Sequence, residues 1–107
     1  MKFNYDSLRK AVKEWVNDPH DAESKYDHIS TWDTSDVTDM SNLFNFSDAQ
    51  SFNENISSWD VSQVTTMSLM FAECRDFNQD ISGWDVSQVT DMSNMFAQCR
   101  DFNQDIS

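Results

Sequence analysis

The sequence predicts an α/β repeat solenoid that follows an N-terminal helical cap. Residues 32–107 contain three copies of one motif, which begin at Trp32, Trp59 and Trp84, so the tryptophans are 27 and then 25 residues apart. A period in this range is typical of a solenoid, in which each unit buries its apolar edge only against its neighbours. The predicted divisions are a cap at 1–31 and repeats at 32–58, 59–83 and 84–107.

The non-repeating segment predicts an amphipathic helix and a second, shorter helix. Apolar residues recur at helical spacing at Leu8, Ala11, Val12, Trp15 and Val16. Asp6 or Ser7 is expected to cap the first helix. Asp18 is expected to cap the second helix, with Pro19 at its first position. The expected role of this segment is to cover the apolar end of the first repeat, and an independent binding helix is the alternative.

Each repeat predicts a short strand and a short helix. Trp84 and Val86 would lie on one face of the strand, with Asp85 and Ser87 on the other. The apolar residues that follow the strand are at helical spacing and predict a short helix. Thr90 or Ser93 could cap this helix. The helical positions are Met92, Met95, Phe96 and Cys99. Stacking such units would give short parallel strands on one face and short helices on the other.

Three motifs resemble the repeat of BspA-like leucine-rich-repeat surface proteins. They are Trp-Asp-Val-Ser-x-Val-Thr-x-Met, Met-Phe-Ala-x-Cys and Asp-Phe-Asn-Gln-Asp-Ile-Ser, within residues 32–107. This family is known in mycoplasmas and other bacteria, with relatives in algae, protists and large viruses. The resemblance implies a leucine-rich-repeat-like solenoid and, for bacterial members, a cell-surface role in adhesion. It implies no catalytic residues.

Charge is distributed unevenly along the chain. Residues 1–31 carry five basic and six acidic side chains, whereas residues 32–107 carry two basic and thirteen acidic ones, a net charge of −11. Such a surface repels nucleic acid and anionic lipid, which are bound through Lys and Arg. Solubility is one explanation of the excess, and a cationic partner or divalent ion is another.

Outward positions of the predicted strands place like residues in rows. Neighbours would lie about 4.8 Å apart, a distance at which carboxylates raise one another's pKa and attract cations. The alternative is that each aspartate accepts hydrogen bonds from nearby turn amides or hydroxyls. These tentative binding residues are Asp33, Asp60, Asp85, Ser35, Ser62 and Ser87.

No pattern in the chain predicts an enzyme, a metal or a cofactor. A single glycine leaves no phosphate-binding loop, and no nucleophile and base can be paired from the sequence. His20 and His28 lack further ligands at metal-binding spacing. Cys74 and Cys99 occupy one slot of successive repeats, which predicts two free core thiols. Two Asn-x-Ser sequons, at Asn45 and Asn55, matter only in a eukaryotic secretory pathway.

The predicted function is a non-enzymatic protein-interaction or adhesion module that docks a protein partner on its strand face. Two alternatives are a structural repeat block within a larger assembly and a weak cation-binding module using Asp33, Asp60 and Asp85. No apolar run is long enough to span a bilayer, and the N-terminal residues lack a signal peptide. Localisation is therefore undecided, although the family resemblance implies the cell surface. Because the third repeat ends where another would begin, we expect a longer array or self-association there, strengthened by salt.

Overall fold

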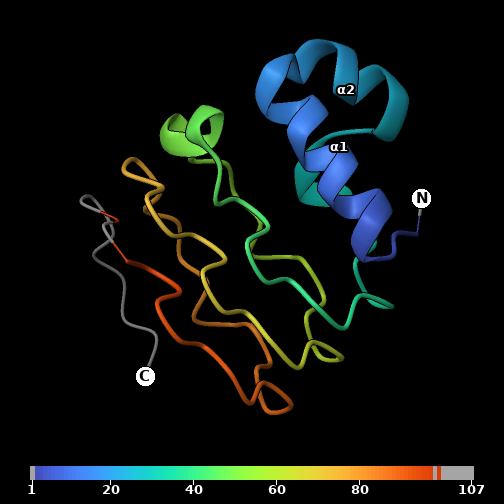
Figure 1. Ribbon diagram of the computed structural model, residues 1–107. Coiled ribbons are helices and arrows are strands. Elements are labelled where there is room, and N and C mark those ends of the chain that lie inside the picture. The colour runs from blue at the N-terminus through green and yellow to red at the C-terminus, as the bar shows by residue number, and fades with distance from the viewer. Residues whose placement is uncertain (1, 98, 100–107) are drawn as a thin grey trace.

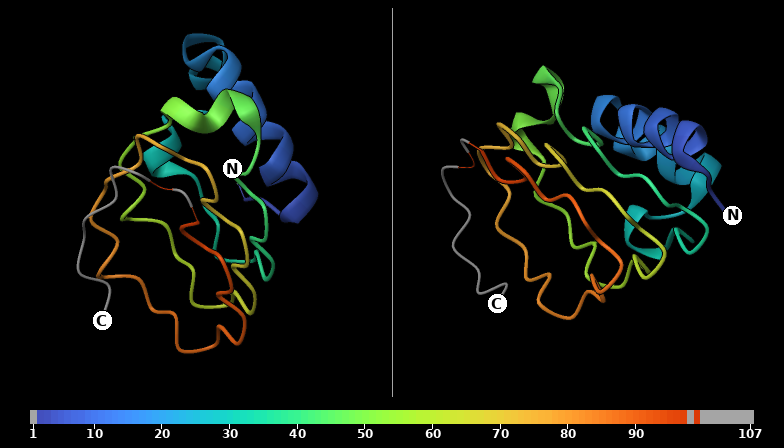
Figure 2. Two further views of the ribbon diagram at one scale, coloured as in Figure 1. Left: turned by 60° about the vertical axis from the view of Figure 1, so that its left-hand side comes forward. Right: turned by 60° about the horizontal axis from the view of Figure 1, so that its bottom comes forward.

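The computed structural model describes residues 2–97 and 99 (Figure 1). Its helical elements are α1 (Tyr5–Asn17), α2 (Pro19–Tyr26), and two 3₁₀ helices, η1 (Ile29–Thr31) and η2 (Ser47–Ser51). The cap lies at one end, and the repeats follow as coils that lie side by side, each farther from α1 than the last (Figures 1 and 2).

The cap contains the two predicted helices. Asn4, rather than Asp6 or Ser7, is the N-cap of α1: its side chain accepts the Ser7 backbone N–H, and the Ser7 hydroxyl accepts the Asn4 N–H in return. Such a reciprocal pair satisfies two otherwise free amides. Asp18 caps α2 and Pro19 is its first residue, which confirms that prediction. The buried face of α1 consists of Leu8, Ala11, Val12 and Trp15.

The cap covers the first repeat, as expected. The Phe3 N–H donates to the Asp33 carbonyl at 3.1 Å. The backbone hydrogen bonding between successive repeats therefore continues into the cap. Aromatic rings of the cap surround Trp32 at centroid distances of 5.1 to 6.0 Å: Phe3, Trp15 and Tyr26. The cap is therefore part of the same hydrophobic core as the repeats.

The prediction of a leucine-rich-repeat-like α/β solenoid is wrong. Among the described residues there is no sheet, and parallel pairing is limited to isolated bridges such as Asp39–Thr66 and Thr66–Asp91. The segment predicted as a strand, around Trp84 and Val86, has no strand conformation. The segment predicted as a helix forms turns in the described residues of all three repeats, followed in the first repeat by η2, so neither Thr90 nor Ser93 caps a helix.

Hydrogen bonds between repeats lie on the segment that was predicted to be helical. The backbone N–H groups of Met40, Asn42 and Phe44 donate to the carbonyls of Thr66, Ser68 and Met70 at 2.9 to 3.0 Å. The second repeat donates in the same way to the third, from Met67, Leu69 and Phe71 to Asp91, Ser93 and Met95. The helical spacing of the apolar residues arises because successive tight turns bring them to the same interior side.

The core consists of aromatic side chains stacked in register. Phe71 lies between Phe44 and Phe96 at centroid distances of 5.2 and 5.5 Å, with interplanar angles of 4° and 3°. The repeat tryptophans Trp32, Trp59 and Trp84 are buried, as predicted, with exposed fractions of 4%, 3% and 8%. The indole N–H of Trp59 donates to the Ile29 carbonyl, in η1 just before the first repeat, at 2.8 Å. Ring contact and hydrogen bond together fix the register of each repeat.

The two cysteines are free, as predicted. Cys74 donates its thiol to the Phe44 carbonyl, and Cys99 donates to the Phe71 carbonyl, so each thiol binds the preceding repeat. Burial raises the pKa of Cys74 to about 12, which keeps this thiol protonated and weakly nucleophilic. The cysteine position of the repeat therefore has a structural role.

Candidate interaction surface

Every repeat changes direction at turns in which an acceptor side chain binds the N–H of a serine two residues later. Such side-chain turns are characteristic of Asp and Asn. They form three rows across the stack. We call them the aspartate row (Asp33, Asp60, Asp85), the central row (Asp39, Thr66, Asp91) and the lead-in row (His28, Asn55, Asp80).

The aspartate row contains the tentative binding residues predicted from the sequence. Asp60 Oδ1 accepts the Ser62 backbone N–H at 2.9 Å and the Ser62 hydroxyl at 2.6 Å. Asp33 binds Ser35 through both groups, and Asp85 binds the N–H of Ser87. The serines thus serve the turns, and the carboxylates lie on a row of turns instead of a strand face. Asp60 and Asp85 are exposed and Asp33 is half-buried.

The predicted rise in the pKa of these aspartates does not occur. Donation by the Ser62 hydroxyl and N–H lowers the pKa of Asp60, and the opposing effect of Asp33 and Asp85 is weaker. The pKa of Asp33 and of Asp85 is lowered by the same pair of donors from their own serines. The row is therefore fully ionised at neutral pH, and it adds a regular line of negative charge to the surface.

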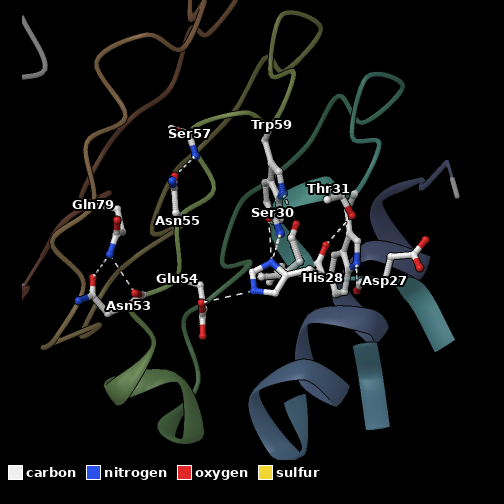
Figure 3. A network of polar contacts seen from close by, with 12 residues as sticks. Asp27, His28, Ser30, Thr31, Asn53, Glu54, Asn55, Ser57, Trp59 and Gln79 are labelled. Carbon is white, nitrogen blue, oxygen red and sulfur yellow. Dashed lines mark hydrogen bonds and ion pairs between the residues drawn. The ribbon is translucent and has the colours of Figure 1, made fainter. Parts of the chain in front are cut away.

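In the lead-in row a histidine takes the place of the acidic or amide residue (Figure 3). His28 Nδ1 accepts the Ser30 N–H at 3.1 Å, as Asn55 Oδ1 accepts the Ser57 N–H at 3.0 Å. His28 Nε2 lies 3.9 Å from a carboxylate oxygen of Glu54. The histidine therefore completes a turn at the junction of cap and repeats, which accounts for it without a metal.

An asparagine row follows the core phenylalanines, and its contacts are structural. The Asn53 side chain accepts the Asn78 N–H at 2.9 Å, and the Gln79 amide donates to both oxygens of Asn53 (Figure 3). These bonds tie the return segment of the first repeat to that of the second. Asn103, the third member, lies outside the described residues.

Left-handed backbone recurs at one position of each repeat, directly after the serine of the central row. Asn42, Leu69 and Asn94 have φ values of 60°, 59° and 56°. Asparagine tolerates this conformation better than other non-glycine residues. The second repeat is the exception, because it has a leucine there.

Among the described residues, no three His, Cys, Asp or Glu side chains are grouped so as to hold a metal ion. In the same part of the chain, neither helix has the length and apolar character that a membrane crossing needs. A small cavity of about 110 Å³ lies between the cap and the first repeat, against Trp15, Pro19, Phe52 and Glu54.

The alternative given for the aspartate row, in which each aspartate accepts hydrogen bonds from nearby turn amides or hydroxyls, is the one that the structure has. The extent of the turns was not predicted, although their signal is visible in the sequence. An Asp or Asn followed two residues later by Ser occurs at Asp33, Asp39, Asn55, Asp60, Asp80, Asp85 and Asp91. A strand with alternating faces also places Asp and Ser on the same side, so the same alternation predicts a strand.

The architecture defines a capped stack of repeats built from turns, with one row of aspartates, Asp33, Asp60 and Asp85, along it. The chain belongs to the family described as "Mycoplasma protein of unknown function, DUF285", whose profile matches residues 6–107. No curated protein and no solved structure shows significant similarity to the chain.

Proposed function

We propose that the chain is a non-enzymatic interaction module that binds a basic protein partner along its aspartate row. The observation that carries the proposal is that the carboxylates repeat at the same position in each unit, held by hydrogen bonds to their own serines. A pre-ordered side chain loses less entropy on binding than a free one. Opposite charge on the partner would speed association and favour the correct register.

A place at the cell surface is the second part of the proposal. The resemblance of the repeat motifs to BspA-like surface proteins supports it, as does the strong negative charge of residues 32–107. Polar rather than apolar contacts are expected, because the aspartate row offers carboxylates and serine hydroxyls. Binding should therefore weaken as salt rises.

Asparagine substitutions separate the charge of the row from its structural role. Asn55 makes the same turn as the aspartates, so Asp33→Asn, Asp60→Asn and Asp85→Asn together should keep the turns and remove three charges. The matched control removes three charges elsewhere, through Glu23→Gln, Asp48→Asn and Asp76→Asn at exposed positions.

Binding to poly-L-lysine at moderate salt, measured by calorimetry, tests the proposal. The triple substitution in the aspartate row should weaken binding clearly more than the control does. Equal weakening by both variants would mean that only net charge matters, and the proposed site would be wrong.

A further inference from the structure

The cleft between the cap and the first repeat has an apolar wall and a carboxylate. Its volume of about 110 Å³ corresponds to roughly three or four water molecules. The lining includes four apolar side chains, Trp15, Val16, Pro19 and Phe52, and the polar residues Asn53 and Glu54. The cap therefore contributes the indole ring and the first repeat contributes the charge.

Glu54 is the charged group of this cleft. Its equivalent in the second repeat is Gln79, whose amide donates to Asn53 of the preceding repeat. The cap takes the place of a preceding repeat beside Glu54 (Figure 3). The Glu54 side chain is 43% exposed, and its carboxylate lies 3.9 Å from His28 Nε2. In the described part of the chain no lysine or arginine pairs with it, so the carboxylate is accessible to a cation.

Two N–H groups at the cleft also lack acceptors among the described residues. The indole N–H groups of the three repeat tryptophans each donate to a backbone carbonyl, whereas that of Trp15, a residue only 3% exposed, does not. The Asn78 N–H donates to the Asn53 side chain of the preceding repeat, and the matching N–H of Asn53 has no such partner. The cleft thus suits a ligand that brings an acceptor as well as a cation.

A lysine residue of another protein has the chemistry that these groups require. Its aliphatic stem can pack on the apolar wall while the ammonium group stays at the solvent-exposed carboxylate. An ammonium group beside aromatic rings gains a further attraction from their faces. The peptide carbonyl of the same residue supplies an acceptor. The net charge of −12 favours the approach of such a cationic partner.

We propose that the cleft binds a lysine side chain of a protein partner. The stem lies against Trp15 and Phe52, the ammonium group pairs with Glu54, and the backbone carbonyl of the lysine accepts the Asn53 N–H. The proposal goes beyond the function proposed above, because the cleft shares no residue with the aspartate row. Each of the two sites can therefore fail its test without the other.

N-acetyl-lysine N-methylamide is the probe, titrated into the ¹⁵N-labelled full chain and followed by nuclear magnetic resonance. Saturable shifts are expected at the Trp15 indole N–H and the Asn53 backbone N–H. The dissociation constant should be on the order of 1 mM, as for other ligands of this size. N-acetyl-norleucine N-methylamide keeps the stem and lacks the ammonium group, so it should bind about fivefold more weakly.

Glu54→Gln removes the carboxylate from the protein and should weaken binding of the lysine probe by a similar factor, about fivefold. The variant is expected to fold, because the second repeat has Gln79 at the equivalent position. Glu73→Gln is the matched control, since it removes the same charge at an exposed position of the second repeat. This control should leave binding unchanged.

Three results would overturn the proposal: no saturable shift at Trp15 and Asn53, equal binding of the norleucine compound, or equal weakening by Glu54→Gln and Glu73→Gln. Shifts confined to the aspartate row would also overturn it, and they would leave the function proposed above standing.

Discussion

The cap and the repeats reach one continuous aromatic core by different means. In the cap, two helices form from local signals: helical spacing, a capping box at Asn4 and Ser7, and Pro19 at a helix start. In the described repeats, the backbone forms turns, isolated bridges and the 3₁₀ helix η2, and most of the order comes from contacts between successive units. No sheet holds the described repeats together. They are joined instead by stacked aromatic rings, by hydrogen bonds from indole and thiol groups, and by backbone N–H groups that donate to carbonyls of the next repeat.

The comparison shows that sequence regularity does not imply regular secondary structure. A repeat specifies only that each unit meets its neighbour in the same way. Here each unit forms its hydrogen bonds within its own turns and with the adjacent repeat. The stability of the repeats is therefore expected to depend on neighbouring units, whereas the helices depend first on residues within the cap.

The largest expected effect comes from Trp59, which connects the first repeat to the second. Trp59→Ala removes a buried ring that stacks on Trp32 at 6.4 Å, and it removes the bond to the Ile29 carbonyl. Loss of a buried tryptophan side chain costs about 3–5 kcal/mol. Urea unfolding should shift strongly to lower denaturant, whether followed by tryptophan fluorescence or by far-ultraviolet circular dichroism.

The two signals discriminate the two regions, because the α-helices of the described residues lie in the cap. Trp15 of α1 contacts Trp32, which in turn stacks on Trp59, so both signals should move together. Trp59→Phe keeps a ring and loses the indole donor, and it should cost less than the alanine change. A helical signal that stays at its original midpoint would mean that the cap folds independently of the repeats.

The cap was predictable and the repeats were only partly so, for physical reasons that particular residues illustrate. Leu8 to Trp15 form a helix because their own spacing and the nearby cap suffice. Trp84 and Val86 alternate with Asp85 and Ser87 in a manner that suits a strand equally well. The bond from the Ser87 N–H to Asp85 resolves that ambiguity, and it depends on a backbone conformation that the hydrophobic pattern does not report.

A smaller effect, opposite in sign, is expected at Leu69. This residue has a left-handed backbone, which costs a non-glycine residue roughly 1–2 kcal/mol. The equivalent residues are Asn42 and Asn94, so the turn accepts asparagine. Leu69→Asn should therefore raise the free energy of unfolding by about 0.5–1 kcal/mol, within the range known for relieving such conformations. Thermal unfolding provides the measurement.

The reciprocal change, Asn94→Leu, tests whether the turn or the leucine side chain decides the outcome. It should lower the melting temperature, because it places a leucine in the same left-handed conformation. If Leu69→Asn lowers stability instead, contacts of the half-buried Leu69 side chain outweigh the backbone strain. That result would weaken the view that turns dominate the repeats.

The smallest expected effect at any single residue is the acid sensitivity of the turn aspartates. Hydrogen bonds from their serines lower the pKa of Asp33, Asp60, Asp80, Asp85 and Asp91. A group whose pKa is lower in the folded state stabilises that state above its unfolded pKa, near 3.9. This contribution is lost as pH falls through the folded pKa. The urea midpoint should thus be steady near neutral pH and decline below about pH 4.

Substituting Asp33, Asp60 and Asp85 by asparagine assigns that decline to a region. Asparagine keeps an acceptor for the serine N–H and does not titrate, so the variant should lose less stability between pH 5 and pH 2 than the parent chain. The cap contributes its own carboxylate, since the Tyr26 hydroxyl and Lys25 lower the pKa of Glu14. Glu14→Gln is therefore the comparison. If this variant reduces the loss of stability between pH 5 and pH 2 more than the three asparagine substitutions do, the cap and not the turns governs acid unfolding.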